Sequence, residues 1–144
     1  MVDADSETLL SDVRSRTDDA IGTSDIILFV LEYDKMTDFD EYIVKKLRRS
    51  KKPIIVIANK ADNNKRDNEA FQHLSLGLGE VVPMSAVQNR GFRELQSLLA
   101  QELKKLGFTY EQNQSADDGL LKLAIIGRPN AGKSTFLNTL IGEN

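Results

Sequence analysis

Four short runs rich in isoleucine, valine and leucine recur along the chain, and helical patterns separate them. The runs cover residues 26–31, 53–58, 80–84 and 121–126. A continuous apolar run of this length, bounded by polar residues, is typical of a strand that is buried on both faces of a parallel sheet. The alternation of strand and helix therefore predicts an α/β fold with a doubly wound parallel sheet of about four strands and flanking helices.

Three segments between or beside these runs carry apolar side chains at helical spacing. Thr37, with Asp40 three residues later, predicts a capping pair at the start of the second segment, and Gly107 is a typical helix stop after the third. The expected helical faces are Leu9, Leu10, Val13, Thr17, Ala20 and Ile21; Phe39, Ile43, Val44 and Leu47; and Phe92, Leu95, Leu98, Leu99, Leu103 and Leu106.

The composition excludes several kinds of chemistry. None of the 144 residues is cysteine, which excludes disulfides, thiolate metal sites and cysteine nucleophiles. No apolar run is long enough for a transmembrane helix, and the acidic start shows no secretory leader, so we expect a cytoplasmic protein without a membrane partner. The net charge of −3 gives no overall attraction to nucleic acid. We expect the basic cluster at residues 45–52 to close a helix and stay solvated rather than to contact RNA.

A glycine-rich segment, Gly127 to Ser134, lies between the fourth apolar run and a helical pattern. Its spacing of glycine, four residues and then Gly-Lys-Ser is that of the phosphate-binding loop of P-loop NTPases. The backbone N–H groups of such a loop wrap nucleotide phosphates, Lys133 reaches the outer phosphates, and the Ser134 hydroxyl binds Mg²⁺. The predicted phosphate-binding residues, with Ser134 also the metal ligand, are Gly127, Asn130, Gly132, Lys133, Ser134 and Thr135.

The tetrapeptide Asn59-Lys60-Ala61-Asp62 directly follows the second run, at the carboxyl end of a predicted strand. Open α/β sheets bind ligands at that edge. The carboxylate of Asp62 can accept hydrogen bonds from the N1–H and the exocyclic amine of guanine, whereas adenine would leave it without donors. We expect Asn59 to brace the neighbouring loops and Lys60 to lay its methylene groups on the base.

The dipeptide Ser85-Ala86 follows the third run in the same way. The backbone N–H of Ala86 is expected to meet the carbonyl oxygen of guanine, which completes a predicted base-reading site. This prediction depends on the placement of the dipeptide after a strand and downstream of the tetrapeptide, because two residues alone are a weak signal.

Two other patterns are not assigned a function. Asp19 to Gly22 has the Asp-x-x-Gly spacing of a γ-phosphate sensor, but it ends a predicted helix instead of following a strand. His73 is the only histidine, and Phe71 and Leu74 beside it indicate a solvated position on a helix or loop surface. No histidine-based catalysis is therefore predicted.

The phosphate loop comes after both base-reading motifs, whereas an ordinary guanine-nucleotide domain begins with it. Between Gly107 and Gly119 the hydrophobic pattern stops, and the residues are polar. We therefore predict a base-reading part at residues 1–107, a flexible linker at residues 108–119, and a strand, phosphate loop and helix of a second domain at residues 120–144.

Several stretches of this sequence resemble Der (also called EngA), a bacterial Era-like GTPase with two G domains in tandem. The resemblance is carried by Ser24 to Val30, Lys52 to Asp62, Leu76 to Glu80 ahead of Ser85-Ala86, and Gly127 to Asn130. It implies a fragment that holds the C-terminal half of the first G domain and the beginning of the second.

The resemblance implies binding of GTP or GDP with Mg²⁺ and a role in assembly of the large ribosomal subunit, with the subunit or its rRNA as partner. Asn130 resembles the asparagine that is associated with K⁺ stimulation in related GTPases. No complete catalytic set is present in this chain, because the switch threonine and sensor aspartate of the family are missing. We therefore expect that the isolated chain does not hydrolyse GTP.

Two other interpretations stay open. The same motif order occurs in circularly permuted ribosome-assembly GTPases, and the chain could instead be a nonenzymatic nucleotide-binding module or an inert fragment. If the linker allows it, residues 121–126 would dock beside residues 26–31 and bring Gly127 to Ser134 opposite Asn59 and Asp62. This arrangement would build one hybrid site and would leave a sheet edge unprotected.

Overall fold

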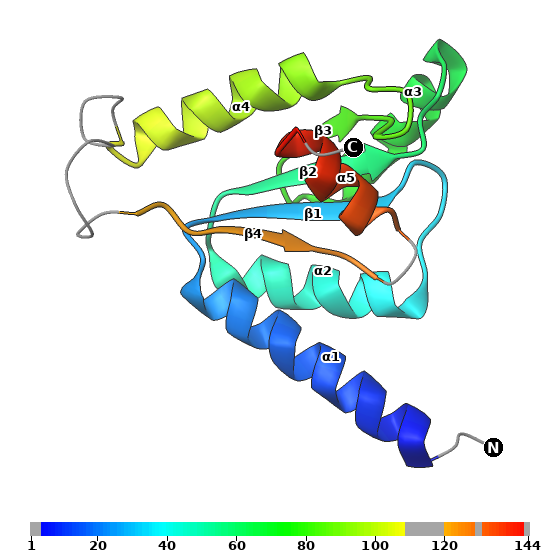
Figure 1. Cartoon of the computed structure of the whole chain (residues 1–144), viewed down its shortest axis with the longest axis vertical. Coiled ribbons are helices and arrows are strands. Elements are labelled where there is room, and N and C mark those ends of the chain that lie inside the picture. Colours follow the sequence, from blue (N-terminus) through cyan, green and yellow to red (C-terminus); the bar gives the residue numbers. More distant parts are fainter. Residues whose placement is uncertain (1–3, 109–119, 129–130, 143–144) are drawn as a thin grey trace.

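A computed structural model of the chain describes residues 4–108, 120–128 and 131–142. These residues form one four-stranded parallel sheet with helices on both faces (Figure 1). The predicted linker at residues 108–119 lies, from residue 109, outside the described residues. The elements in chain order are α1 (Ala4–Thr23), β1 (Ile26–Glu32), α2 (Asp38–Ser50), β2 (Ile54–Asn59), α3 (Asn64–Ala70), the 3₁₀ helix η1 (Phe71–Leu76), β3 (Glu80–Pro83), α4 (Phe92–Lys105), β4 (Leu123–Ile126) and α5 (Lys133–Leu140).

The strand order in the sheet is β3-β2-β1-β4. Phe29 in the middle strand β1 lies opposite Val56 of β2 on one side and opposite Ile126 of β4 on the other. The predicted pairing of residues 121–126 with residues 26–31 is thereby confirmed, although the strand itself begins only at Leu123. Asp25 fixes the start of this pair, because its backbone N–H donates to the Lys122 carbonyl oxygen at 2.7 Å.

The core has two layers, one on each face of the sheet, because alternate strand residues point to opposite faces. Ile27, Phe29 and Leu31 pack with buried residues of α1 and α2, whereas Leu28 and Val30 pack with buried residues of α4 and α5. In Figure 1, α1 and α2 accordingly lie on one side of the strands and α4 and α5 on the other. The predicted doubly wound α/β architecture is confirmed.

The helix boundaries follow local chemistry. Asp40 N–H donates to the Thr37 hydroxyl at 3.3 Å and the Asp40 carboxylate accepts from the Thr37 N–H at 2.9 Å, so the predicted capping pair at the start of α2 is a complete capping box. Gly107 lies two residues beyond Lys105, the last residue of α4, and has a positive φ of 85°. Within the described residues no helix is long and apolar enough to span a membrane.

The first predicted helical face is only half correct. Ile21 at the end of α1 is buried, but Leu9 and Leu10 are 65% and 42% exposed. The helix diverges from α2 toward its N-terminus, so its first turns leave the body of the molecule (Figure 1). Helical spacing identifies an apolar face but does not say whether a partner covers it.

Candidate nucleotide-binding site

The predicted motifs meet at one edge of the sheet. All four strands are parallel, so their carboxyl ends lie at the same edge. Asn59 ends β2, Ser85 follows shortly after β3, and Gly127 follows β4 directly. The structure therefore brings together residues that are up to 73 positions apart in the sequence, as Gly132 and Asn59 are.

The side chain of Asn59 joins all three motifs. It is 4% exposed, and its Nδ2 donates to the Ala131 carbonyl oxygen at 3.0 Å. Its Oδ1 accepts from the Ala86 N–H at 3.3 Å. The two bonds require opposite ends of the amide, so they fix the orientation of the side chain. One buried carboxamide thus connects the phosphate loop to the base-reading dipeptide.

Each carboxylate oxygen of Asp62 is held by one contact. Its Oδ1 accepts from the Ser85 hydroxyl at 2.7 Å, and its Oδ2 pairs with Nη1 of Arg66 at 2.9 Å. The Asp62 side chain is 35% exposed, so it keeps access to solvent and to a ligand. A carboxylate fixed at one oxygen is suited to accept two parallel N–H donors, such as those on the edge of guanine. Arg66 pairs with the second carboxylate oxygen, which such a base would also use.

Glu32, at the end of β1, is the centre of an ionic network. Its Oε1 lies 2.8 Å from Lys60 Nζ and 3.1 Å from Arg128 Nη2. Arg128 Nε donates to Oδ2 of the fully buried Asp40 at 3.2 Å. The hydrogen bond from Lys60 and the charges of Lys60 and Arg128 lower the pKa of Glu32 below its ordinary value, although burial opposes this shift. The network fastens the start of the phosphate loop to the base-reading tetrapeptide and to α2.

Two positions of the phosphate loop can hold only glycine. A Cβ atom on Gly132 would lie 2.2 Å from Asn59 Nδ2, and the residue has a φ of +95°. A Cβ atom on Gly127 would lie 2.4 Å from the Val30 carbonyl oxygen. The backbone of the loop therefore lies directly against β1 and the end of β2, which a side chain at either position would prevent.

Lys133 folds back over this loop. A Cβ atom on Gly127 would also lie 3.3 Å from Lys133 Cδ, so the lysine stem runs close to the first glycine. Burial lowers the pKa of Lys133, because desolvation disfavours its charged form. An anion beside this ammonium group would offset that cost.

The start of α5 fits a phosphate group. Gly132 caps the helix without a side-chain hydrogen bond, and Ser134 and Thr135 are exposed in the first turn. Among the described residues no group of three or more His, Cys, Asp or Glu side chains could hold a metal ion. The exposed Ser134 hydroxyl is the group that the sequence predicts as the Mg²⁺ ligand of this chain. Asn130, the predicted K⁺-associated residue, lies outside the described residues.

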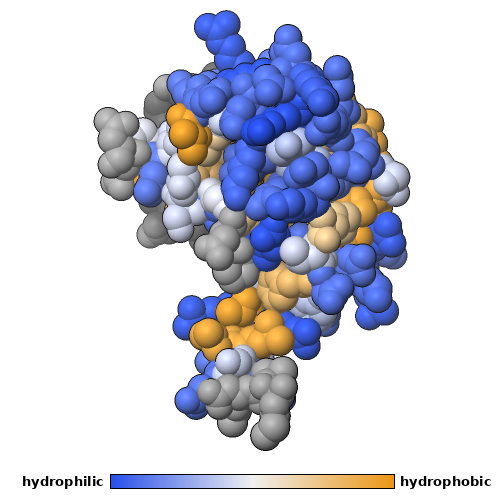
Figure 2. All heavy atoms as spheres, turned by 90° about the vertical axis from the view of Figure 1, so that its right-hand side faces the viewer, coloured by the Kyte–Doolittle hydropathy of each residue, from blue (hydrophilic) through white to orange (hydrophobic). Residues whose placement is uncertain are grey.

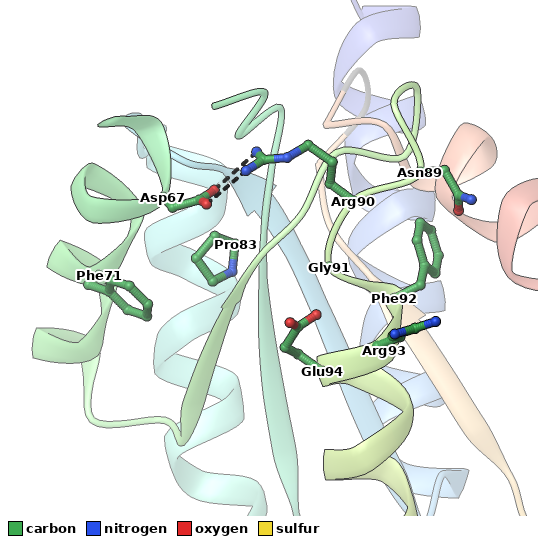
Figure 3. Close-up of a pocket in the computed structure, with 9 residues that line it drawn as sticks. All are labelled: Asp67, Phe71, Pro83, Asn89, Arg90, Gly91, Phe92, Arg93 and Glu94. Carbon is green, nitrogen blue, oxygen red and sulfur yellow. Dashed lines mark hydrogen bonds and ion pairs between the residues drawn. The ribbon is translucent and has the colours of Figure 1, made fainter. Parts of the chain in front are cut away.

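Arg90 is a residue that sequence reasoning missed. It lines a pocket of about 620 Å³, where it pairs with Asp67 at 3.0 Å (Figure 3). It also donates to the Ala61 carbonyl oxygen, so it contacts the backbone of the tetrapeptide. No sequence signal marks this contact. The predicted site residues do not line this pocket, whose lining is Asp67, Phe71, Pro83, Asn89, Arg90, Gly91, Phe92, Arg93 and Glu94.

The predicted surface position of His73 is wrong. The residue is 5% exposed, and its Nε2 lies 2.9 Å from the Glu32 carbonyl oxygen. Leu76 and Leu78 pack against the core, and this anchoring of the segment turns the imidazole inward. The ring is a buried structural group that braces the end of β1. Asp19 to Gly22 lie within α1, in agreement with their rejection as a phosphate sensor.

Comparison with known proteins gives related sequences along nearly the whole chain. A family model described as 50S ribosome-binding GTPase matches residues 122–144. GTPase Der of Cytophaga hutchinsonii is 39% identical over 133 residues, which cover 92% of this chain and 29% of that protein. GTPase Der of Salinispora tropica is 43% identical over 132 residues, with coverages of 91% and 28%. GTPase Der of Clostridium kluyveri is 35% identical over 138 residues, with coverages of 95% and 30%. The chain thus spans less than a third of the length of these relatives.

Proposed function

Because the chain belongs to the GTPase Der family, we propose that it binds guanine nucleotide at one composite site, built from its phosphate loop and its two base-reading motifs. The observation that supports this proposal most strongly is the pair of hydrogen bonds made by Asn59 to Ala131 and Ala86. A buried amide that is satisfied by both parts of the chain makes the two half-sites one structural unit.

We expect the site to select guanine over adenine because only guanine supplies the hydrogen-bond donors that the carboxylate needs. Asp62 presents a carboxylate that is fixed by Ser85, and guanine supplies two N–H donors to it. Adenine has no donor at the corresponding ring nitrogen, so it would leave the carboxylate unpaired. Rejection of a base that leaves a site group unpaired is stronger than rejection by size.

The phosphates bind at the other end of the site. Lys133, whose charged form is disfavoured by burial, gains an anionic partner, and the open start of α5 adds backbone donors and a favourable partial charge. Bound Mg²⁺ would neutralise phosphate charge, with the Ser134 hydroxyl as its ligand from this chain. For Asn130 we keep the proposal of a K⁺-associated role.

We propose that the 144-residue chain binds GTP without hydrolysing it. The only Asp-x-x-Gly in the sequence is Asp19 to Gly22, which lies inside α1 and away from the phosphate loop. Phosphoryl transfer needs a positioned water in addition to the bound phosphates and metal. In the whole protein, we propose GTP hydrolysis linked to assembly of the large ribosomal subunit in the cytoplasm, with rRNA or the subunit as partner. The family description and the resemblance support this role.

Titration with fluorescent GDP in the presence of Mg²⁺, with fluorescent ADP as the comparison, tests the proposal. We expect GDP to bind at least about tenfold more tightly than ADP, and we expect Lys133→Ala and Asp62→Ala each to weaken GDP binding at least about tenfold. The exposed Lys122→Ala and Asp12→Ala serve as matched controls and should change nothing. Equal binding of both nucleotides, or insensitivity to Asp62→Ala, would contradict the proposed base-reading role.

A further inference from the structure

The N-terminal half of α1 is an unpartnered helix. Residues 5–12 are all exposed, and contact with α2 begins where Arg14 Cζ lies 4.8 Å from the ring centroid of Tyr42. Farther along, Asp18 pairs with Lys46 at 3.5 Å. About two turns of helix therefore project from the body (Figure 1). A helical segment this short has little stability of its own in water, so it gains from a partner.

The projecting turns carry an apolar face. Leu9 and Leu10 are 65% and 42% exposed, and the half-buried Val13 continues the same face into the body. At 100° per residue, these three side chains lie within a sector of about 100°. Figure 2 shows apolar surface on the lower projection of the molecule, which α1 forms. Water would be displaced favourably from this face by a second apolar surface.

The charged residues that flank this face are self-complementary, because each side of the face carries one acidic and one basic residue. On a helical wheel Asp5 and Arg16 lie on one side of the apolar sector, and Glu7 and Arg14 lie on the other. In each pair the two residues are equally far from a point between residues 10 and 11. A twofold axis at that point would therefore set Asp5 against Arg16 of a second copy, and Glu7 against Arg14 of a second copy. Within the described residues, no ion pair is recorded for Asp5, Glu7 or Arg16.

We propose that α1 is a self-docking surface, on which the α1 helices of two copies of this chain pair in antiparallel orientation. The pattern selects that orientation, because a parallel pair in register would set Asp5 against Glu7 of the second copy and Arg16 against Arg14 of the second copy, which places like charges together. The paired segment is short and so falls below the size of a standard stable interface. We therefore expect a weak, salt-sensitive dimer with a Kd on the order of 10 μM.

Sedimentation velocity of the full 144-residue chain between about 2 and 200 μM tests the proposal. We expect a monomer–dimer equilibrium, which Leu10→Glu weakens at least about tenfold. Leu106→Glu is the matched control, because Leu106 at the end of α4 has the same 42% exposure and should leave the equilibrium unchanged. A chain that stays monomeric throughout this range would overturn the proposal, as would equal effects of the two substitutions.

A charge exchange tests the orientation. Arg16→Glu should weaken the dimer several-fold, and adding Asp5→Arg should restore it, because the exchange reverses each pair without removing it. Failure of the second change to restore the dimer would refute the antiparallel pairing. Far-UV circular dichroism should show the same helix content for all variants at low concentration, since both positions are exposed and lie outside the core.

In the same way, Leu10→Cys places a thiol beside the proposed twofold axis in a chain that has no other cysteine. It should form a disulfide-linked dimer under mild oxidation much faster than Leu106→Cys. Equal rates would mean random collision and would count against the pairing.

Discussion

The proposed base-reading part of the chain and the proposed phosphate-loop part meet at one edge of the sheet but are built differently. All seven residues of β1 are buried, and five of the six residues of β2 are buried. In β4 only one residue of four is buried, and in α5 only Phe136 is. A buried strand has neighbours on both sides and both faces, whereas β4 pairs, among the residues that the structure describes, with β1 alone. We infer from this comparison that the phosphate-loop part depends for its structure on packing against the base-reading part.

A few contacts hold the phosphate-loop part in place. They include the pairing of β4 with β1, the hydrogen bond between Asn59 and Ala131, the ion pairs of Arg128, and the stacking of Phe136 on Phe92 with ring centroids 5.7 Å apart. Segments with few buried contacts open at lower free energy than the rest of a fold. We therefore expect the phosphate loop to undock without unfolding of the base-reading part.

Truncation of one phenylalanine in each part should give the largest difference. Phe29 and Phe136 are both fully buried. Phe29→Ala should lower the free energy of unfolding by about 3–5 kcal/mol, because it leaves a cavity in the centre of the sheet. Phe136→Ala should speed hydrogen exchange in α5 and change global unfolding far less. Urea unfolding and amide exchange measure the two effects, and equal losses of global stability would mean that the two parts unfold as one.

Gly132→Ala should break the hydrogen bond between Asn59 and Ala131 while leaving the fold of the base-reading part intact. The new Cβ atom would meet Asn59 Nδ2 at 2.2 Å, and the φ of +95° adds strain. We expect GDP affinity, measured by fluorescence titration, to fall at least about 100-fold, or about 2.7 kcal/mol. Gly142→Ala is the matched control, because Gly142 also has a positive φ, of +82°, but no atom of the described residues lies within 4 Å of the added Cβ. A similar loss in both variants would point to backbone strain alone.

The strands could be predicted because their signal is local. The continuous apolar runs predicted β1 and β2 to within one residue at each end, and the Thr37–Asp40 pair predicted the start of α2. Leu9 and Leu10 were assigned to a buried face because periodicity does not reveal where the neighbouring layer ends. His73 was assigned to the surface because its burial depends on the packing of η1 against distant residues.

The site could be predicted in its motifs but not in most of its connections. The positions of Asn59 and Gly132 follow from short sequence patterns beside strands. The contacts of Arg128 with Asp40 and Glu32 join residues 88 and 96 positions apart, and neither pairing has a local sequence signature. The contact that Arg90 makes with Ala61 is equally non-local.

Glu32→Gln should remove a pH dependence of stability. The pKa of Glu32 in the folded chain is lowered from 4.5, first by the hydrogen bond from Lys60, so its carboxylate stabilises the fold above that ordinary value. The stabilisation is lost as the pH falls through the lowered folded pKa. We expect the free energy of unfolding of the unsubstituted chain to fall more steeply below about pH 4.5 than that of Glu32→Gln.

Urea unfolding at a series of pH values measures the slopes. Glu102→Gln, which removes a carboxylate from an exposed pair with Lys105, serves as the control and should keep the slope of the unsubstituted chain. Parallel curves for the unsubstituted chain and Glu32→Gln would show that the ionic network contributes nothing to folding.

Arg66→Ala should have the smallest effect. It releases the Asp62 oxygen that now pairs with Arg66 at 2.9 Å, and exposed pairs of this kind are worth at most about 1 kcal/mol. We expect GDP to bind about two- to fivefold more tightly, as measured by titration. The neighbouring exposed Lys65→Ala should leave affinity unchanged. Weaker binding by Arg66→Ala would mean that the arginine orients the carboxylate instead of competing with the base.

The most direct test of a single composite site is hydrogen–deuterium exchange of the chain with GDP and Mg²⁺, compared with ADP and Mg²⁺. One site predicts that GDP slows exchange at residues 59–62, at residues 85–86 and at residues 131–136 together, with the same GDP concentration at half-effect, and that ADP does not. Protection confined to residues 131–136, or equal protection by ADP, would contradict the account, because the phosphate loop would then bind nucleotide without the base-reading part.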